Sequence, residues 1–314
     1  MINYYKRGPR DRKLKELERF ESGCWINVTE PDEEELTFLK EEFLLDEHNL
    51  HSGLDKHEIP RIEFSDEGIY LIIKTVPQTG KNDINTLLII IGKSYLLTLS
   101  KHQPLFIKNL IEEKNKINTN ERLGTLIIML SFVNKEFGHM THNIVKSVNL
   151  TRDSVTDLKD EDLTELLSQE SVLNSMVSYY NYLNIVYERL SKHVKKEKDK
   201  EKIEDLLIEG QEIFRLGQQS IRSISNIRNH LEILITKRMN KLIALFTIAT
   251  VALMIPSMIF SMYGMNIALP GQHDLDIFYY INGGCVIFLG IFILYLYKTK
   301  MFKWKKSVIV YILW

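Results

Sequence analysis

The sequence predicts an α+β domain followed by long helices and two C-terminal transmembrane helices. Strand-like and helix-like segments alternate within residues 1–119, helical periodicity dominates from about residue 120, and two long uncharged stretches lie after residue 240. With 45% hydrophobic residues, 26% charged residues and a net charge of −1, the 314-residue chain is neither disordered by composition nor a strongly basic nucleic-acid-binding protein. Its two cysteines lie far apart in the sequence, which argues against a disulfide framework.

The α/β domain is expected to begin with a strand over Cys24 to Val28. The acidic run that follows predicts a helix with Pro31 and acidic residues in its first turn, and a second helix is expected over about Asp46 to Leu54. Three segments rich in β-branched and aliphatic residues predict further strands, the last two joined as a hairpin at Gly92-Lys93. They are Ile69 to Val76, Thr86 to Ile91 and Tyr95 to Ser100.

Motifs of enzymatic chemistry do not emerge from the sequence. The tripeptide Gly92-Lys93-Ser94 ends like a phosphate-binding P-loop, but that loop needs a glycine five positions earlier, where Leu87 stands, so a turn is the better interpretation. No nucleophile, acid–base pair or cofactor cradle is evident, and we predict a protein that is not an enzyme and has no organic cofactor. His48, His51 and His57 are interpreted as surface histidines rather than a metal site.

Long helices are expected from about Asn120. The charged run Lys195 to Lys202 is interpreted as a solvated connection or a helix start, and a single helix is predicted from about Ile203 to Met262. Along its first part, apolar residues and glycines recur at spacings of three and four. They form a seam that is expected to pack against other helices. A rod of this length cannot be covered by its own small domain, which predicts a homo-oligomer. The seam comprises Ile203, Leu207, Gly210, Phe214, Gly217, Ile221, Ile224, Leu231 and Ile235.

Two stretches of 21 uncharged residues, 242–262 and 277–297, match the roughly 20 residues that a helix needs to cross a bilayer. Lysine and arginine flank both stretches on their outer sides, whereas the connecting residues 263–276 contain neither. By the positive-inside rule, we expect both ends of the chain in the cytoplasm. The charged start lacks the apolar core of a signal peptide.

The residues directly after the first stretch are Tyr263, Gly264, Met265 and Asn266. Here the chain resembles the CorA-type magnesium transporter superfamily, also called the Gly-Met-Asn metal ion transporter superfamily, whose members carry this tripeptide after the first of two C-terminal spans. The resemblance continues upstream. Leu54-Asp55, Glu58 and Pro60-Arg61-Ile62-Glu63 look like a stretch of the family's α/β domain, and Met239-Asn240 with Thr247 and Pro256 looks like its pore helix.

The resemblance implies a funnel-shaped homopentameric channel in the cell membrane, with the lipid bilayer, divalent cations and its own copies as partners and no nucleic acid. It would carry Mg²⁺, with Co²⁺ and Ni²⁺ as further candidates. The implied parts are a cytosolic α/β domain (1–119), antiparallel willow helices (120–200), a stalk helix (201–241), a pore-lining span (242–262), an outer loop (263–276), an outer span (277–297) and a basic cytosolic tail (298–314).

The chemistry of Mg²⁺ suits these residues, because the ion gives up its water reluctantly. A ring of Asn266 carbonyls could accept hydrogen bonds from coordinated water, while Gly264 is expected to adopt a backbone conformation closed to other residues and Tyr263 to hold the turn. Below this filter, one face of the span is predicted to line the pore through Asn240, Ile243, Phe246, Thr247, Thr250, Met254 and Ser257. Packing against the second span is the alternative role for each of these residues.

Two further groups of acidic residues complete the candidate site. Asp274 and Asp276 in the outer loop would attract cations, or serve only solubility. In the family, a stalk carboxylate and acids of a neighbouring α/β domain bind regulatory Mg²⁺. Asp205 occupies the stalk position, but His51 and Ser52 stand where the partner acids are expected, so Asp55 and Glu58 are the remaining candidates and weaker metal dependence is the hypothesis.

Two other functions remain open on the sequence alone. A Zn²⁺ transporter of the same superfamily is disfavoured because no cysteine or histidine lies on the predicted pore face. A non-conducting membrane-anchored scaffold, whose stalk binds protein partners, is the alternative from another class.

Overall fold

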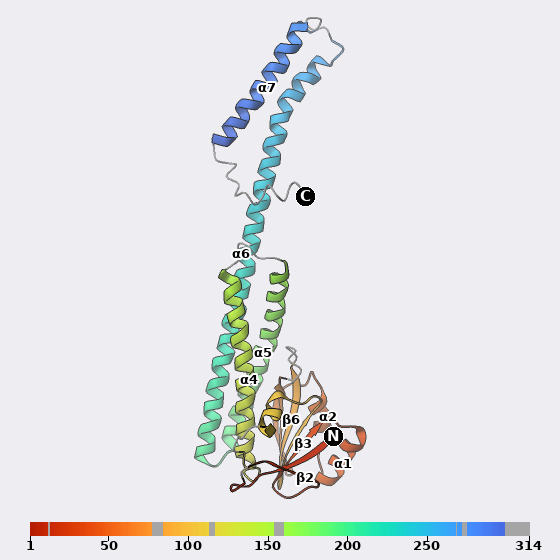
Figure 1. Ribbon diagram of the computed structural model, residues 1–314, viewed down its shortest axis with the longest axis vertical. Helices are drawn as coiled ribbons and strands as arrows, with labels where there is room; N and C mark the ends of the chain where they lie inside the picture. The colour runs from red at the N-terminus through yellow and green to blue at the C-terminus, as the bar shows by residue number, and fades with distance from the viewer. Residues whose placement is uncertain are drawn as a thin grey trace. The chain divides into compact units, whose positions relative to one another are not determined.

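The computed structural model describes residues 1–11, 13–76, 84–112, 117–153, 160–267, 269–271 and 275–298 (Figure 1). The chain divides into two compact units, Met1–Asn229 and His230–Trp314. One helix, α6, runs from Glu197 to Tyr263 and contributes to both units, so the predicted uninterrupted helix is confirmed. The predicted cation-attracting Asp274 and the tail from residue 299 onward lie outside the described residues.

The described part of the first unit contains a seven-stranded mixed sheet with the strand order β2-β1-β3-β7-β6-β5-β4. Strands β3 and β7 are parallel, and every other neighbouring pair is antiparallel. The predicted strands and the β6–β7 hairpin at Gly92-Lys93 are confirmed, whereas β1, β2 and β4 were missed because they are short and rich in polar residues. The strands are β1 (Ile2–Lys6), β2 (Lys15–Leu17), β3 (Cys24–Thr29), β4 (Arg61–Phe64), β5 (Gly68–Thr75), β6 (Asn85–Gly92) and β7 (Tyr95–Ser100).

Two short helices with well-formed N-caps precede β4. The helices are α1 (Glu33–Phe43) and α2 (Glu47–Leu54). Asp32 caps α1 by accepting a hydrogen bond from the Glu35 amide at 2.7 Å, and Asp46 caps α2 in the same way. The expectation that Pro31 lies in the first turn of α1 was wrong: the aspartate cap starts the helix two residues after the proline.

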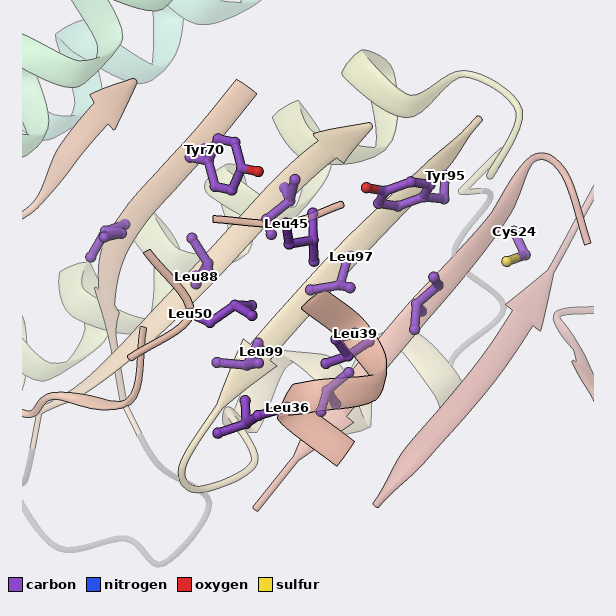
Figure 2. Packing of buried hydrophobic residues seen from close by; sticks show 14 residues of the cluster. Cys24, Leu36, Leu39, Leu45, Leu50, Tyr70, Leu88, Tyr95, Leu97 and Leu99 are labelled. Carbon is purple, nitrogen blue, oxygen red and sulfur yellow. The ribbon is translucent and has the colours of Figure 1, made fainter. Parts of the chain in front are cut away.

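One cluster of core residues lies between these two helices and one face of the sheet (Figure 2). Leu39 of α1 and Leu50 of α2 pack over Leu88 and Leu97 from the central strands, and all four are buried. Alternate residues of each strand point to this face, as the pleat of a strand requires. The family-like stretch lies between α2, which packs on this face, and β4 at the edge of the sheet.

Beyond the short helix α3 (Leu105–Glu112), the first unit contains α4 (Arg122–Asp153), α5 (Asp160–His193) and the first part of α6. A buried hydrogen-bond chain ties these three long helices together. The Tyr187 hydroxyl donates to Asn134 Oδ1 at 3.0 Å, and Asn134 Nδ2 donates to the Leu206 carbonyl at 3.0 Å. Each helix contributes one member, which fixes their register.

The seam of α6 follows a heptad pattern whose second row was not predicted. Ile203, Gly210, Gly217 and Ile224 are buried as expected. The alternate row is formed by the buried Leu206, Ser220 and Ile227 with the half-buried Ile213, whereas the predicted Leu207, Phe214, Ile221 and Leu231 are half-buried and Ile235 is exposed. Side chains of α5 lie against both glycines. The seam up to residue 227 is therefore covered by the chain's own α4 and α5. The rest of α6 is mostly exposed, and the homo-oligomer expected from the length of this helix stays a prediction.

A buried carboxylate lies on α4 without a counterion. Both side-chain oxygens of Glu136 are shielded from solvent and have no hydrogen-bond partner among the described residues. Burial alone raises the pKa of Glu136 to about 8. At neutral pH this residue is therefore largely protonated, which the sequence did not indicate.

Candidate functional site

The second unit consists of the last part of α6 and of α7 (Leu275–Lys298). Both helices are long and apolar enough to cross a membrane, although only 11% and 6% of their most apolar 18 residues are buried within the chain. The core helices of a soluble domain would be mostly buried. This exposure therefore favours lipid or other copies of the chain as their surroundings.

One face of α6 packs against α7. Leu245, Ile248, Ala252, Pro256 and Ile259 recur every three or four residues and are the more buried residues of this part of α6. Pro256 and Ile259 line a groove together with Cys285 and other residues of α7. The α7-facing side of the helix is thus fixed by the structure.

The predicted pore-lining residues occupy the opposite face of α6. At about 100° per residue, all seven lie within about 60° of the direction opposite Ala252. All are exposed, including the apolar Ile243 at 57%, Phe246 at 66% and Met254 at 64%. The alternative that these residues pack against the second span is therefore wrong within the chain. They form a separate face, which we call the open face: Asn240, Ile243, Phe246, Thr247, Thr250, Met254 and Ser257.

Two hydroxyl groups of the open face are oriented by the helix itself. Thr247 Oγ1 donates to the Ile243 carbonyl at 2.8 Å, and Thr250 Oγ1 donates to the Phe246 carbonyl at 2.8 Å. Because each hydroxyl has one proton, these bonds leave only oxygen lone pairs directed away from the helix. The open face therefore offers acceptors to a cation or to its coordinated water.

The predicted filter begins where α6 ends. Tyr263 is the last helical residue, and the Gly264 amide still donates to the Phe260 carbonyl at 3.0 Å. Met265 and Asn266 follow as exposed residues, and no described residue is a hydrogen-bond partner of the Asn266 amide. The amide therefore remains available for a ligand.

The expected reason for a glycine at 264 was wrong. The φ angle of Gly264 is not in the left-handed region, and a Cβ there would meet only the Phe260 and Ser261 carbonyl oxygens at 3.4 and 3.5 Å, which is ordinary contact. The conformationally demanding residue is Gly271, with φ +75°. This φ is strained for other residues, and a Cβ on Gly271 would also lie 1.7 Å from Ile277 Cδ1 of α7, so glycine is favoured at this position.

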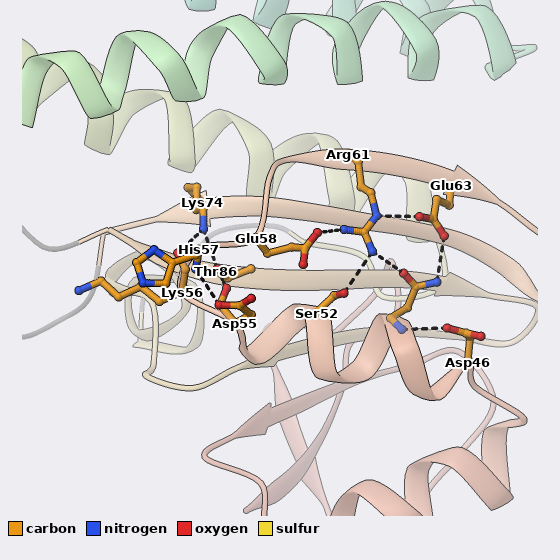
Figure 3. Close-up of polar contacts among 11 residues, drawn as sticks. Asp46, Ser52, Asp55, Lys56, His57, Glu58, Arg61, Glu63, Lys74 and Thr86 are labelled. Carbon is orange, nitrogen blue, oxygen red and sulfur yellow. Dashed lines mark hydrogen bonds and ion pairs between the residues drawn. The ribbon is translucent and has the colours of Figure 1, made fainter.

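The candidate regulatory carboxylates lie in the first unit, and two of them already have polar partners. Glu58 forms an ion pair with Arg61, while Asp55 ends α2 and accepts a hydrogen bond from the His57 amide at 2.8 Å (Figure 3). Asp205 lies on an exposed position of α6. No group of three or more His, Cys, Asp or Glu side chains that could hold a metal was found in the described part of the chain.

Arg61 organises the polar network next to these carboxylates, a role that the sequence did not reveal. Besides its ion pair with Glu58, Arg61 contacts Glu63 through Nε at 2.6 Å. Its Nη2 donates to Asn49 Oδ1 and Ser52 Oγ at 3.1 and 3.2 Å (Figure 3). The hydrogen bond from Asn49, and after it the Arg61 guanidinium, lower the pKa of Glu63. A cationic side chain of the protein itself thus lies beside Glu58, one of the two remaining candidates for a shifted metal site.

The fold and these two regions define a class of protein: a mixed α/β domain, three long helices, and two apolar helices joined by a Gly-Met-Asn turn. The family model described as CorA-like Mg²⁺ transporter protein matches residues 20–298, and the chain belongs to that family.

The chain is 25% identical over 291 residues to the cobalt/magnesium transport protein CorA of Methanocaldococcus jannaschii, covering 88% of this chain and 90% of that protein.

Solved structures give the same fold. The complete structure of the CorA magnesium transporter from Methanocaldococcus jannaschii superimposes with a TM-score of 0.80 at 20% identity, covering 94% of this chain and 97% of that one. The full-length CmaX protein gives 0.73 at 15% identity over 94% and 97% of the two chains. The cytoplasmic domain of ZntB from Vibrio parahaemolyticus gives 0.63 at 10% identity over 75% and 98%. Proteins with different names thus share this architecture, and ion choice must be argued from the site.

Proposed function

We propose that this chain forms a homopentameric channel that conducts hydrated Mg²⁺ into the cytoplasm and recognises the ion through a ring of Asn266 side chains. The observation that carries the proposal is the division of α6 into a face that packs on α7 and an opposite open face that leads to the Gly-Met-Asn turn. If copies of the chain surround an axis, the open faces would line a shared path and α7 would lie outside. Co²⁺ and Ni²⁺, which also hold water strongly, are expected to share the path.

The open face suits a hydrated divalent cation. It has hydroxyl acceptors at Thr247 and Thr250, an amide at Asn240 and no fixed charge that would hold the ion tightly. Its large apolar side chains would form constrictions able to close the path by excluding water. A membrane potential of about 100 mV stabilises a divalent cation inside by about 4.6 kcal/mol, roughly a thousandfold concentration ratio, so no nucleotide is required.

The orientation of the chain in the membrane is inferred from the distribution of its lysines and arginines. The first span is preceded by Lys237, Arg238 and Lys241, while the loop 263–276 has no lysine or arginine. The proposal therefore places both ends of the chain in the cytoplasm and the Asn266 ring at the outer face of the cell membrane. Asp276, at the start of α7, would then lie near the outer mouth.

The test is Mg²⁺ uptake by the purified protein in liposomes under an inside-negative potential. Asn266→Ala is expected to reduce uptake strongly. Asn282→Ala is the matched control, because this second asparagine lies on α7 and its Nδ2 donates to the Phe278 carbonyl at 2.8 Å. Unchanged flux in Asn266→Ala would contradict the filter: the measured flux would then come from a contaminating channel, with this chain a non-conducting scaffold, or from a path that does not use Asn266.

Zn²⁺ is the second candidate ion, since one structural relative is named ZntB. The open face has no cysteine or histidine to bind a soft metal. We therefore expect Mg²⁺, Co²⁺ and Ni²⁺ to be carried in preference to Zn²⁺ in the same liposome assay, and a reversed order would assign the chain to Zn²⁺.

For regulation, we propose that closure depends only weakly on cytosolic Mg²⁺. Arg61 neutralises Glu58, one of the carboxylates available near the expected metal position. Sub-millimolar Mg²⁺ that protects the protein from protease, with the protection lost in Asp205→Ala, would contradict this proposal.

A further inference from the structure

A cavity of about 680 Å³ lies between α5 and the loop that joins α2 to β4, within the first unit. It is distant in sequence from the open face, and the transport proposal does not use it. Its volume falls in the range typical of small-molecule sites.

The most informative lining residue is Lys74, at the end of β5. This lysine is only 9% exposed, and its ammonium group donates to the Lys56 carbonyl at 2.6 Å and to Thr86 Oγ1 at 2.9 Å (Figure 3). An ammonium group has three N–H donors, so one is not used by these bonds. No carboxylate of a described residue lies within ion-pair distance of it.

A buried ammonium group without a counterion is unfavourable, and its pKa is expected to fall. Burial lowers the pKa of Lys74, although Asp55 and Glu58 oppose this effect from a distance. An anion bound beside Lys74 would supply the missing counterion and the missing acceptor together.

The remaining walls favour an anion that carries an apolar group. Lys56 and His57 lie on the same rim as Lys74, and the Glu58 carboxylate is turned toward Arg61. Across the cavity, α5 presents a polar face in which side chains repeat at helical spacing. Ser171, Asn174, Ser175 and Ser178 form this face, and Ile59, Val172 and Tyr182 supply apolar surface.

We propose that this cavity binds a small phosphorylated molecule, with its phosphate at Lys74 and its apolar part against Tyr182 and Ile59. Phosphate oxygens are strong acceptors for ammonium and hydroxyl groups, and an aromatic ring offers a stacking surface. The inference is independent of transport, because binding is measured without ion flux.

The test uses the purified full chain in an uncharged detergent with EDTA, titrated by calorimetry with AMP, inorganic phosphate and adenosine. AMP is expected to bind saturably, inorganic phosphate to compete with it, and adenosine not to bind. Lys74→Met is expected to weaken AMP binding at least about tenfold, the loss of one charge-assisted hydrogen bond. Lys101→Met, which removes an exposed lysine outside the cavity, should leave it unchanged.

A second variant protects the test against a folding defect. Ser178 is exposed on α5 and lines the cavity, so Ser178→Glu should fold and repel an anion. If Lys74→Met does not fold, the loss of AMP binding in Ser178→Glu decides the question. The proposal is overturned if AMP does not bind at millimolar concentration, if adenosine binds equally well, or if Ser178→Glu binds AMP normally.

Discussion

The buried carboxylate of Glu136 gives a prediction whose size follows from the structure. Its pKa is raised from 4.5 to about 8 by burial, with no partner among the described residues to offset the cost of its charge. Since one pKa unit corresponds to about 1.4 kcal/mol, ionisation would destabilise the fold by at most about 5 kcal/mol. Relaxation and water penetration reduce this bound, and we expect about 2 to 3 kcal/mol.

The sign of the effect sets the pH window. Below pH 4.5 the carboxyl of Glu136 is protonated in both the folded and the unfolded chain, so it adds no penalty. Between pH 4.5 and about 8 the unfolded chain loses this proton more readily, and the stability of the fold falls as pH rises. Above about pH 8 the penalty is complete and constant.

The assay compares thermal unfolding of the wild type and Glu136→Gln in detergent at pH 5 and pH 8.5. The neutral amide removes the ionisation, so the variant should gain roughly 4 to 12 °C relative to wild type at pH 8.5 and little at pH 5. Glu201→Gln, a change of an exposed glutamate on α6, is the control and should behave like wild type at both pH values. An equal difference between Glu136→Gln and wild type at both pH values would refute the reasoning.

Three other predictions concern the turn and the polar network. Gly271→Ala should lower the melting temperature and disturb α7, because its Cβ would collide with Ile277 and its φ is +75°; an unchanged melting temperature and flux would contradict this turn. Gly264→Ala should leave the melting temperature unchanged, since its Cβ meets only ordinary contacts within the chain. If this variant nevertheless loses Mg²⁺ flux, glycine is needed at 264 because of contacts between copies of the chain. Arg61→Met should destabilise the first unit by roughly 1 to 3 kcal/mol near pH 7, measured by chemical denaturation. That loss should shrink as pH falls through the lowered pKa of Glu63, where the carboxylate is protonated; a loss independent of pH would show that the ion pairs do not cause it.

Much of the architecture could be predicted from local patterns. The strands β3, β5, β6 and β7, the long helices and the uncharged lengths of the two C-terminal helices follow from composition and periodicity, because these depend on neighbouring residues. The polar edge strand β2 and the short strand β4 could not be found this way. Both are short and rich in polar residues, so composition and alternation do not mark them, and only their pairing with β1 and β5 identifies them as strands.

The candidate site was likewise predictable only in part. A period of 3.6 residues places Thr250 and Met254 on one side of α6, but the sequence could not say which side of the helix α7 covers. The sequence also assigned a backbone role to Gly264 that the structure gives to Gly271. Nor could it show that Arg61 pairs with Glu58, since this contact depends on how the loop before β4 lies against α2.

The sequence by itself determined the helices, the apolar spans and the position of the Gly-Met-Asn turn, because hydrophobic length and local periodicity act through adjacent residues. Only the tertiary structure decided which face of α6 stays open, that Lys74 and Glu136 are buried with no counterion among the described residues, and that α4 and α5 cover the α6 seam. These properties depend on packing between segments that are distant in the sequence. A side chain becomes buried only when such segments pack around it and exclude water.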